Sequence, residues 1–151
     1  MYVERDLEKK IKGYLSAPEI ISVVGARQAG KTTLLKYLQA GIQDSSFLTF
    51  EDIEIRELFD LDIKSFIELY IQPVRVIFID EFQYSKKGGQ GLKFIYDTVP
   101  GRKLMISGSS SLDLTIKAVK HLTGRILSFT LYPFSFRELL RSKDERLSKL
   151  F

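Results

Sequence analysis

The sequence predicts an α/β domain built on a mainly parallel sheet. Short strand-like runs alternate with helical patterns along the chain, and most of these runs are almost continuously apolar, as strands covered on both faces are. The length of 151 residues fits one domain with a buried core. Ligands of such sheets bind at the carboxyl ends of the strands, so the residues that follow each strand are the first candidates for function.

The elements follow in order from apolar spacing and from residues that stop a helix. Leu7, Ile11 and Leu15 lie on one face of a helix over residues 4–15, and Pro18 prevents it from continuing. After it, β-rich runs predict five strands, with helical spacing between them. The predicted strands are 19–24, 46–51, 75–79, 103–107 and 126–131, and the predicted helices are 31–39, 62–71, 92–98 and 112–122.

A last helix begins after Ser135, because Glu138 stands three residues further on and completes a capping box. The pattern contains no stop signal for this helix before Phe151. We therefore expect residues 1–151 to form one domain that is the N-terminal part of a longer protein.

Composition excludes several kinds of site. The chain has no cysteine and a single histidine, His121, which excludes a disulfide framework and a thiolate site and argues against a histidine-built metal centre. No apolar run reaches the roughly 18 residues of a membrane span and no signal peptide opens the chain, so we expect a cytoplasmic protein without membrane contact. The net charge of +4 permits contact with nucleic acid or phosphate ligands without requiring it.

The segment after the first strand carries the most specific pattern. Residues 25–32 read GARQAGKT and match G-x-x-x-x-G-K-[ST], the Walker A phosphate loop. Glycines permit positive φ and close backbone approach, while the loop amides and the start of the next helix bind an anion. Lys31 reaches the β and γ phosphates, and the Thr32 hydroxyl ligates Mg²⁺. The predicted nucleotide-binding residues are Gly25, Ala26, Arg27, Gln28, Ala29, Gly30, Lys31, Thr32 and Thr33.

A second acidic site follows the third strand. Asp80 closes an apolar run, which is the Walker B arrangement, and we expect it to support Mg²⁺ together with Thr32. Glu81, the next residue, is placed to polarise the attacking water. The alternative is that both acids start a solvated loop. The chain contains no asparagine, so the guanine-reading N-K-x-D motif is absent and ATP is favoured over GTP.

These motifs, taken with others in the same order, resemble a prokaryotic family of AAA+ P-loop ATPases. The similar segments are GARQAGKTTL at 25–34, FED at 50–52, FIDEFQ at 78–83, ISGSSS at 106–111, LTGR at 122–125 and LYPFSFRE at 131–138. Together they cover essentially the whole chain. The resemblance implies a three-layer P-loop NTPase sandwich with five strands in the order 5-1-4-3-2, ATP with Mg²⁺ as ligands, and a C-terminal domain of poorly defined function.

Two further residues take their roles from this resemblance. In the implied order the fourth strand lies between the first and the third, so a hydroxyl at its tip stands near the γ-phosphate. Ser109 is the first candidate for this sensor and Ser110 the second, and a turn or helix cap is the alternative. Arg125 is implied as a catalytic arginine acting on a neighbouring subunit's phosphate or on its own, and pairing with a helix C-terminus is the alternative. The predicted catalytic residues are Lys31, Glu81, Ser109 and Arg125.

Two departures from the family pattern bear on activity. The fourth-strand sensor is a serine where asparagine is common, and no helical lid with a second sensor arginine follows within the 151 residues. We therefore expect an ATP-binding, ATP-hydrolysing domain that couples nucleotide state to conformational change in attached or partner domains, with weak or no turnover in isolation. The alternative is a nucleotide-gated interaction or DNA-binding module with negligible turnover. A small-molecule phosphotransferase is a third, weaker hypothesis.

The hypotheses leave several partners open, and two further segments are interpreted from their residues alone. ATP, a C-terminal effector domain or protein partner, further copies of the chain and nucleic acid all remain open. Glu51 and Asp52, after the second strand, are predicted to cap the next turn rather than to approach Mg²⁺. KKGGQG at 86–91 is predicted from its composition to form a mobile, solvated loop, and contact with nucleic acid or a partner is the alternative.

Overall fold

The computed structural model describes residues 2–109 and 122–142. The second-choice sensor Ser110, His121, and the predicted helix over 112–122 except for its last residue lie outside the described residues. The same is true of the chain from residue 143 onward. Within the described part, no helix is both long enough and apolar enough to cross a membrane.

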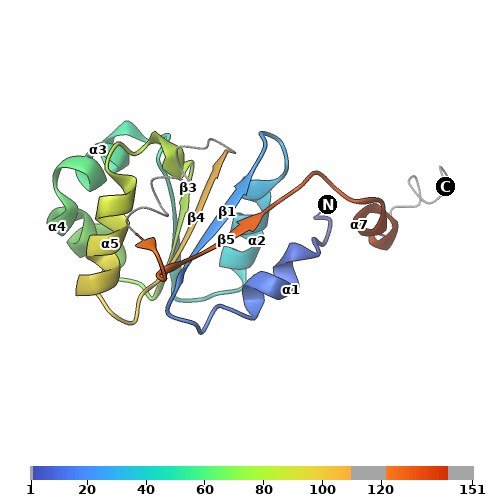
Figure 1. Ribbon diagram of the computed structural model, residues 1–151, viewed down its shortest axis with the longest axis horizontal. Coiled ribbons are helices and arrows are strands. Elements are labelled where there is room, and N and C mark those ends of the chain that lie inside the picture. Colours follow the sequence, from blue (N-terminus) through green and yellow to red (C-terminus); the bar gives the residue numbers. More distant parts are fainter. Residues whose placement is uncertain (1, 110–121, 143–151) are drawn as a thin grey trace.

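Five strands form one sheet at the centre of the domain (Figure 1). Each inner strand pairs with one strand on either side, and every pair is parallel. The strands are β1 (Ile20–Gly25), β2 (Ser45–Thr49), β3 (Val76–Asp80), β4 (Lys103–Ser109) and β5 (Ile126–Thr130). Their order, β2-β3-β4-β1-β5, is the expected 5-1-4-3-2 order counted from the other edge, so the predicted fold is confirmed.

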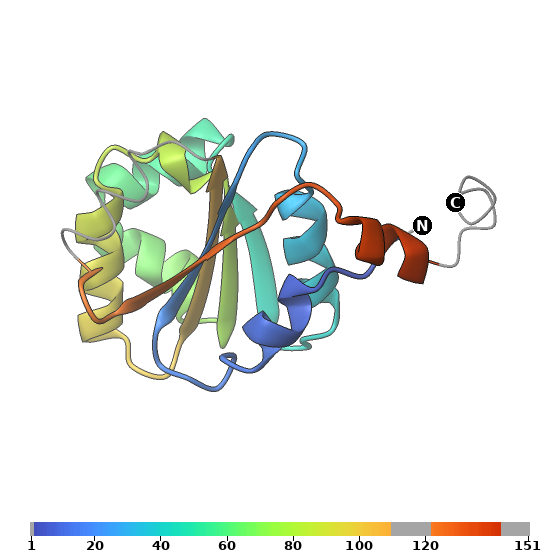
Figure 2. The same cartoon turned by 45° about the vertical axis from the view of Figure 1, so that its right-hand side comes forward.

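Helices cover both faces of the sheet and give the domain three layers (Figure 1). The first layer consists of α1 (Leu7–Lys12) and α2 (Lys31–Ala40). The layer on the other face consists of α3 (Ile53–Leu61), α4 (Ile63–Phe66), the π-helix η1 (Ile67–Ile71) and α5 (Gly88–Thr98). The short helix α7 (Phe136–Arg141) follows β5 and lies beyond α2, next to the N-terminal segment (Figure 2).

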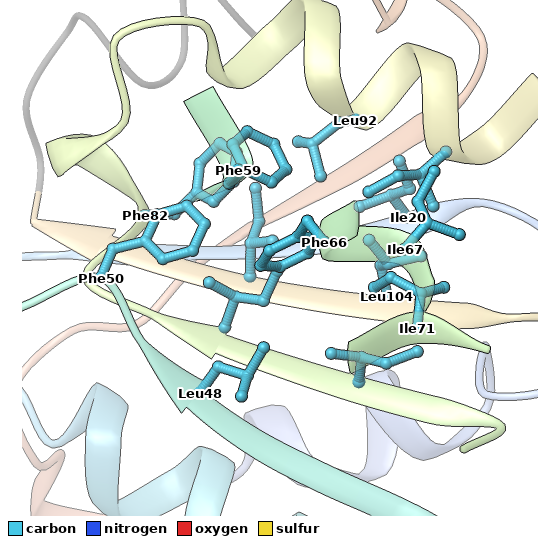
Figure 3. Close-up of a cluster of buried hydrophobic side chains, with 14 of the residues drawn as sticks. Ile20, Leu48, Phe50, Phe59, Phe66, Ile67, Ile71, Phe82, Leu92 and Leu104 are labelled. Carbon is cyan, nitrogen blue, oxygen red and sulfur yellow. The ribbon is translucent and has the colours of Figure 1, made fainter. Parts of the chain in front are cut away.

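A group of phenylalanine rings fills the core between the sheet and α3–α5 (Figure 3). Phe50 follows β2, Phe82 follows β3, and both pack on Phe59 of α3, with ring centroids 5.2 and 5.7 Å away. Phe66 of α4 meets the Phe59 ring at 5.1 Å. Because Phe82 comes two residues after Asp80, this cluster fixes the carboxyl edge of the sheet beneath the predicted acidic site.

The helix α3 occupies residues to which the apolar pattern above assigns no element. Its N-cap is Asp52, whose carboxylate accepts hydrogen bonds from the amides of Glu54 (3.0 Å) and Ile55 (3.3 Å). The predicted capping role of Asp52 is therefore confirmed. The signal that identifies α3 is the helical spacing of Ile55, Leu58 and Phe59 directly after this cap.

The prediction of a mobile loop over residues 86–91 is wrong. The helix α5 starts at Gly88, and Gly91 lies buried in its first turns. A Cβ atom on Gly91 would stand 2.3 Å from Cζ of Phe59, so the glycine is what allows α5 to approach α3. Asp60 also accepts hydrogen bonds from the amides of the two residues before α5. The glycine-rich composition reflects close helix packing here, not a flexible segment.

Smaller differences concern the ends of elements. The first helix is shorter than the predicted 4–15, and the predicted helix over 62–71 is α4 continued by the π-turn of η1. The capping box of α7 is confirmed: the Glu138 amide donates to Ser135 Oγ at 3.1 Å, and the Ser135 amide donates to Glu138 Oε1 at 2.8 Å.

Candidate nucleotide-binding site

The loop between β1 and α2 has a backbone that few residue types adopt easily. Gly30 caps α2 with φ of 97°, and Gln28, which is not a glycine, has φ of 65°. Left-handed backbone at a non-glycine residue is uncommon and concentrates at functional sites. The side chains of Ala26, Arg27 and Gln28 are exposed, so the loop lies at the surface, over the end of β1.

Gly25 serves close packing rather than positive φ. A Cβ atom at this position would lie 2.4 Å from the carbonyl oxygen of Leu131, the residue after β5. The amide of Leu131 in turn donates to the carbonyl of Val24 at 2.8 Å. The first glycine of the pattern thus lets the chain after β5 run against the start of the loop, while Gly30 supplies the left-handed conformation.

Lys31 extends from the start of α2 back across the loop. Its ammonium donates to the carbonyl oxygens of Gly25 (2.7 Å) and Ala26 (2.8 Å). Burial lowers the pKa of Lys31, although the carboxylates of Glu81 and Asp80 act in the opposite direction. The cation therefore lies inside the loop with two acids facing it.

The carboxylate of Asp80 joins the loop to the end of β3. Thr32, at the second position of α2, donates its hydroxyl proton to Asp80 Oδ2 at 2.6 Å. From β4, Ser107 Oγ donates to the other oxygen, Oδ1. Asp80 is only 4% exposed, so its charge is stabilised chiefly by these directed contacts and by Lys31 nearby. The fold brings the loop and the acid together although 48 residues separate Thr32 from Asp80.

Ser107 of β4 makes the contact with Asp80, and the role of Ser109 near the γ-phosphate stays a prediction. Ser109 lies at the tip of β4, where its Cα pairs in register with that of Gly25. Side chains two residues apart on a strand point to the same face, so Ser107 and Ser109 lie on the same side of β4 at different depths. The two-residue period of the strand is thus the feature of the sequence that could have pointed to Ser107 as a second serine on this face. Its side chain is fully buried.

Glu81 adopts a left-handed backbone directly after β3, with φ of 54°. The amide group of Gln83 donates to Glu81 Oε2 at 2.6 Å, so one oxygen of the carboxylate is held. Strained backbone of this kind at a carboxylate beside a loop is typical of a functional position. Gln83 has no signal in the sequence beyond its place two residues after Glu81.

Arg125 lies at the opposite end of the sheet from the loop. Its carbonyl accepts the amide of Ile20, at the start of β1, at 2.8 Å. Five steps along β1, roughly 17 Å at about 3.3 Å per residue, therefore separate Ile20, beside Arg125, from Gly25. The Nε atom of Arg125 lies 3.4 Å from Asp97 in the last turn of α5. Action on a phosphate bound by its own chain does not fit this position, whereas the role toward a neighbouring subunit stays a prediction.

Arg5 contacts the loop although it lies far from it in the sequence. Arg5 donates from Nη1 to the carbonyl of Ala29, in the middle of the loop, at 2.8 Å. No local pattern around Arg5 indicates this contact, which spans 24 residues.

The chain is similar in sequence to one protein family and to one curated relative. The sequence profile of the AAA domain family matches residues 17–140. An uncharacterized protein of Methanocaldococcus jannaschii is 30% identical over 157 aligned residues, which cover 99% of this chain and 33% of the relative. The chain thus spans about a third of that curated relative.

Similar solved structures share the fold at low sequence identity. The Aeropyrum pernix ORC1 protein, solved in complex with DNA, has a TM-score of 0.61 at 15% identity over 99% of this chain and 50% of its own. AMPPCP-bound DnaA from Aquifex aeolicus has a TM-score of 0.61 at 15% identity over 97% and 51%. The P-loop NTPase domain of the sigma-54 transport activator from E. coli has a TM-score of 0.56 at 10% identity over 85% and 93%.

Proposed function

The chain belongs to the AAA domain family, within the superfamily of AAA+ P-loop ATPases, and from this premise we propose that it binds ATP with Mg²⁺ and hydrolyses it. The observation that carries the proposal is the 2.6 Å hydrogen bond between Thr32 and Asp80. This bond joins the phosphate loop to the acid that ends β3. A mere glycine-rich turn has no reason to share a hydroxyl with a buried carboxylate.

The loop supplies the phosphate contacts in this proposal. The amides of residues 25–33 and the start of α2 bind the phosphate oxygens, since free N–H groups and the helix dipole both favour an anion. Lys31, whose ammonium lies at the loop, neutralises charge on the β and γ phosphates. The negative charge of the ligand offsets the lowered pKa of Lys31, so nucleotide binding favours its charged form.

Thr32 of the loop and Asp80 opposite it fit Mg²⁺. Thr32 and Asp80 offer hydroxyl and carboxylate oxygens, the hard ligands this ion prefers beside substrate phosphates. Because Thr32 donates its proton to Asp80, the lone pairs of its oxygen remain available for the cation. When bound, the ion supplies positive charge that stabilises the transferring phosphoryl group.

Glu81 is the proposed positioner of the attacking water. Gln83 holds Oε2 of this carboxylate, so Oε1 is the oxygen that accepts a hydrogen bond from the water. Ser109, at the tip of β4 in register with Gly25, is proposed to contact the γ-phosphate. Ser107 supports Asp80 from below rather than touching the ligand.

Coupling of nucleotide state to attached or partner domains is the finer part of the proposal. It is supported by the family and by the relative, of which the matched segment is only 33%. A DNA-binding module with negligible turnover is the second candidate, because the chain carries a net charge of +4 and the similar ORC1 protein was solved with DNA. We also propose that Arg125 acts on the phosphate bound by a neighbouring copy of the chain.

Titrations and turnover assays on matched variants test the proposal. Lys31→Ala is expected to lose binding of a fluorescent ATP analogue, whereas Glu81→Gln keeps binding and loses phosphate release. Lys36→Ala, on the exposed side of the same helix, and Glu57→Gln, exposed on α3, serve as controls that keep both. Full binding by Lys31→Ala would show that the site is assigned wrongly.

The two candidate functions separate by a further pair of measurements. Hydrolysis that depends on Glu81 supports the ATPase, while absent turnover together with DNA binding that weakens steeply with salt supports the second candidate. DNA that fails to bind at low salt, as duplex or single strand, removes that candidate.

A further inference from the structure

Arg5 lies at a junction of four segments of the chain. Its side chain is 3% exposed, and its guanidinium donates to the Ala29 carbonyl in the loop (2.8 Å), to Glu138 of α7 (2.9 Å) and to the carbonyl of Tyr132 after β5. The ring of Phe134 stacks on it at 4.1 Å. A buried arginine that donates from all three nitrogens and is stacked on a ring is costly to misplace, so its partners are fixed relative to one another.

The contact with Ala29 sets the direction of a peptide group in the phosphate loop. All described peptide bonds are trans, and in a trans peptide the C=O and the N–H point in opposite directions. Because Arg5 holds the carbonyl of Ala29, the amide N–H of Gly30 points away from Arg5. Gly30 has φ of 97°, a region where a glycine peptide rotates with little steric resistance. The hydrogen bond from Arg5 therefore restricts the orientation of the peptide group between Ala29 and Gly30.

The other side of Arg5 reaches α7. Glu138 accepts from Arg5 Nε and from the amide of Asp6, both at 2.9 Å, and also closes the capping box with Ser135. Burial raises the pKa of Glu138, but the hydrogen bonds from Ser135, Asp6 and Arg5 outweigh it and leave the pKa below its ordinary value. Figure 2 shows the consequence for the fold: the N-terminal segment and α7 lie side by side, beyond α2.

We propose that Arg5 is a positioning residue that orients the Gly30 amide for phosphate binding and, through Glu138, makes this orientation depend on the docking of α7. The inference rests on the proposed ATP binding and adds the element to which the loop is coupled. Docked α7 strengthens nucleotide binding, and by thermodynamic reciprocity bound nucleotide strengthens the docking of α7 by the same factor. Nucleotide state is thereby transmitted to α7.

The first measurement compares the affinity of the full chain for Mg²⁺–AMPPCP among variants. Arg5→Lys keeps the charge but replaces the planar fork with a point donor, and we expect roughly tenfold weaker binding from the loss of one charge-assisted hydrogen bond. Glu138→Gln is expected to act in the same direction, and the double variant to show less than the sum of the two effects, because both act through one contact. The controls are Arg102→Lys, whose guanidinium donates to the Gln72 carbonyl far from the loop, and exposed Glu57→Gln.

The second measurement is the distance between α2 and α7 with and without nucleotide. A purely structural role of Arg5 would leave the response of this distance to nucleotide unchanged. The chain has no cysteine, so Lys36→Cys on α2 and Leu140→Cys on α7, both exposed, allow two specific spin labels. In the otherwise unaltered chain, AMPPCP is expected to narrow the distribution of distances between the labels. In the Arg5→Lys background this response is lost, and in the Arg102→Lys background it persists.

The outcomes separate this inference from the proposed function. AMPPCP binding that is equal in the parent, Arg5→Lys and Glu138→Gln overturns the coupling and leaves ATP binding intact. A lowered melting temperature with unchanged affinity shows a structural role only and also overturns it. Should Arg5→Lys not fold, Glu138→Gln, which keeps the size of the side chain, decides the question. A parent that does not bind AMPPCP refutes both proposals.

Discussion

Replacing Gly25 with alanine tests whether the first glycine of the loop is required by close packing. The added Cβ would lie 2.4 Å from the carbonyl oxygen of Leu131, whereas real Cβ contacts stay above 3.0 Å. The chain after β5 must therefore move by about 0.6 Å, the difference between these two distances. Such a shift stretches the 2.8 Å hydrogen bond from the Leu131 amide to Val24, which lies directly at the contact.

The expected cost follows from these two effects. A weakened backbone hydrogen bond costs about 1 kcal/mol and overpacking costs about 1–3 kcal/mol. The lower entropy of the unfolded alanine chain returns about 0.5–1 kcal/mol. We therefore expect Gly25→Ala to lower the free energy of unfolding by about 2 kcal/mol and, because the loop moves with its first residue, to weaken ATP binding as well.

Urea unfolding followed by circular dichroism measures the first effect. With m-values of about 1–3 kcal/mol/M for small proteins, a loss of about 2 kcal/mol moves the midpoint down by roughly 1 M. Gly41→Ala is the matched control, because φ is −84° there and the nearest atom to an added Cβ, the Leu38 carbonyl oxygen, is 3.6 Å away. A midpoint for Gly25→Ala equal to that of the parent or of Gly41→Ala would refute the packing explanation.

Three other substitutions probe the helix packing, the acidic site and the α7 junction. Gly91→Ala places a Cβ 2.3 Å from Phe59 and should lower the free energy of unfolding in urea by about 1–3 kcal/mol. The additional substitution Phe59→Leu should recover part of this loss. A gain in stability, as expected at an exposed helical glycine, would contradict the close approach of the two helices. Ser107→Ala removes the hydroxyl that donates to Asp80 and should raise the Mg²⁺ concentration needed for half-maximal hydrolysis. The comparison variant Ser109→Ala should chiefly slow turnover. Equal Mg²⁺ dependence in the parent and Ser107→Ala would show that Ser107 does not support Asp80 in metal binding. The pKa of Glu138 is lowered by folding, so its contribution to stability is complete above its ordinary value of 4.5 and is lost as the pH falls through the lower value of the folded state. Urea midpoints from about pH 7 to about pH 3 should thus fall less steeply for Glu138→Gln than for the parent, and parallel curves would exclude this contribution.

The sheet and its phosphate loop are predictable because they depend on local sequence. Apolar runs such as residues 75–79 mark strands covered on both faces, and the spacing of Gly25, Gly30 and Lys31 marks the loop between strand and helix. The strand order comes with the family resemblance and not from the runs themselves. The capping box of Ser135 and Glu138 is equally local, which explains why it can be identified from four residues.

The remaining features depend on contacts between distant segments. The glycines of residues 88–91 have the composition of a loop, and only the position of Phe59 across from Gly91 explains why they form a helix. Arg5 contacts residues 24 and 133 positions away, so nothing in its neighbourhood indicates its partners. Which serine of β4 meets Asp80 depends on the register of β3 and β4, which composition does not fix.

We propose that residues 25–33 hold the phosphates of ATP opposite Asp80. A crystal structure of the full chain grown with Mg²⁺ and AMPPCP tests this proposal. We expect phosphate oxygens hydrogen-bonded to the loop amides and to Lys31, with the metal ion ligated by Thr32. Nucleotide bound elsewhere, for instance in the cavity lined by Pro18, Arg75 and Arg102 at the other end of the sheet, with the loop free of phosphate, would contradict it.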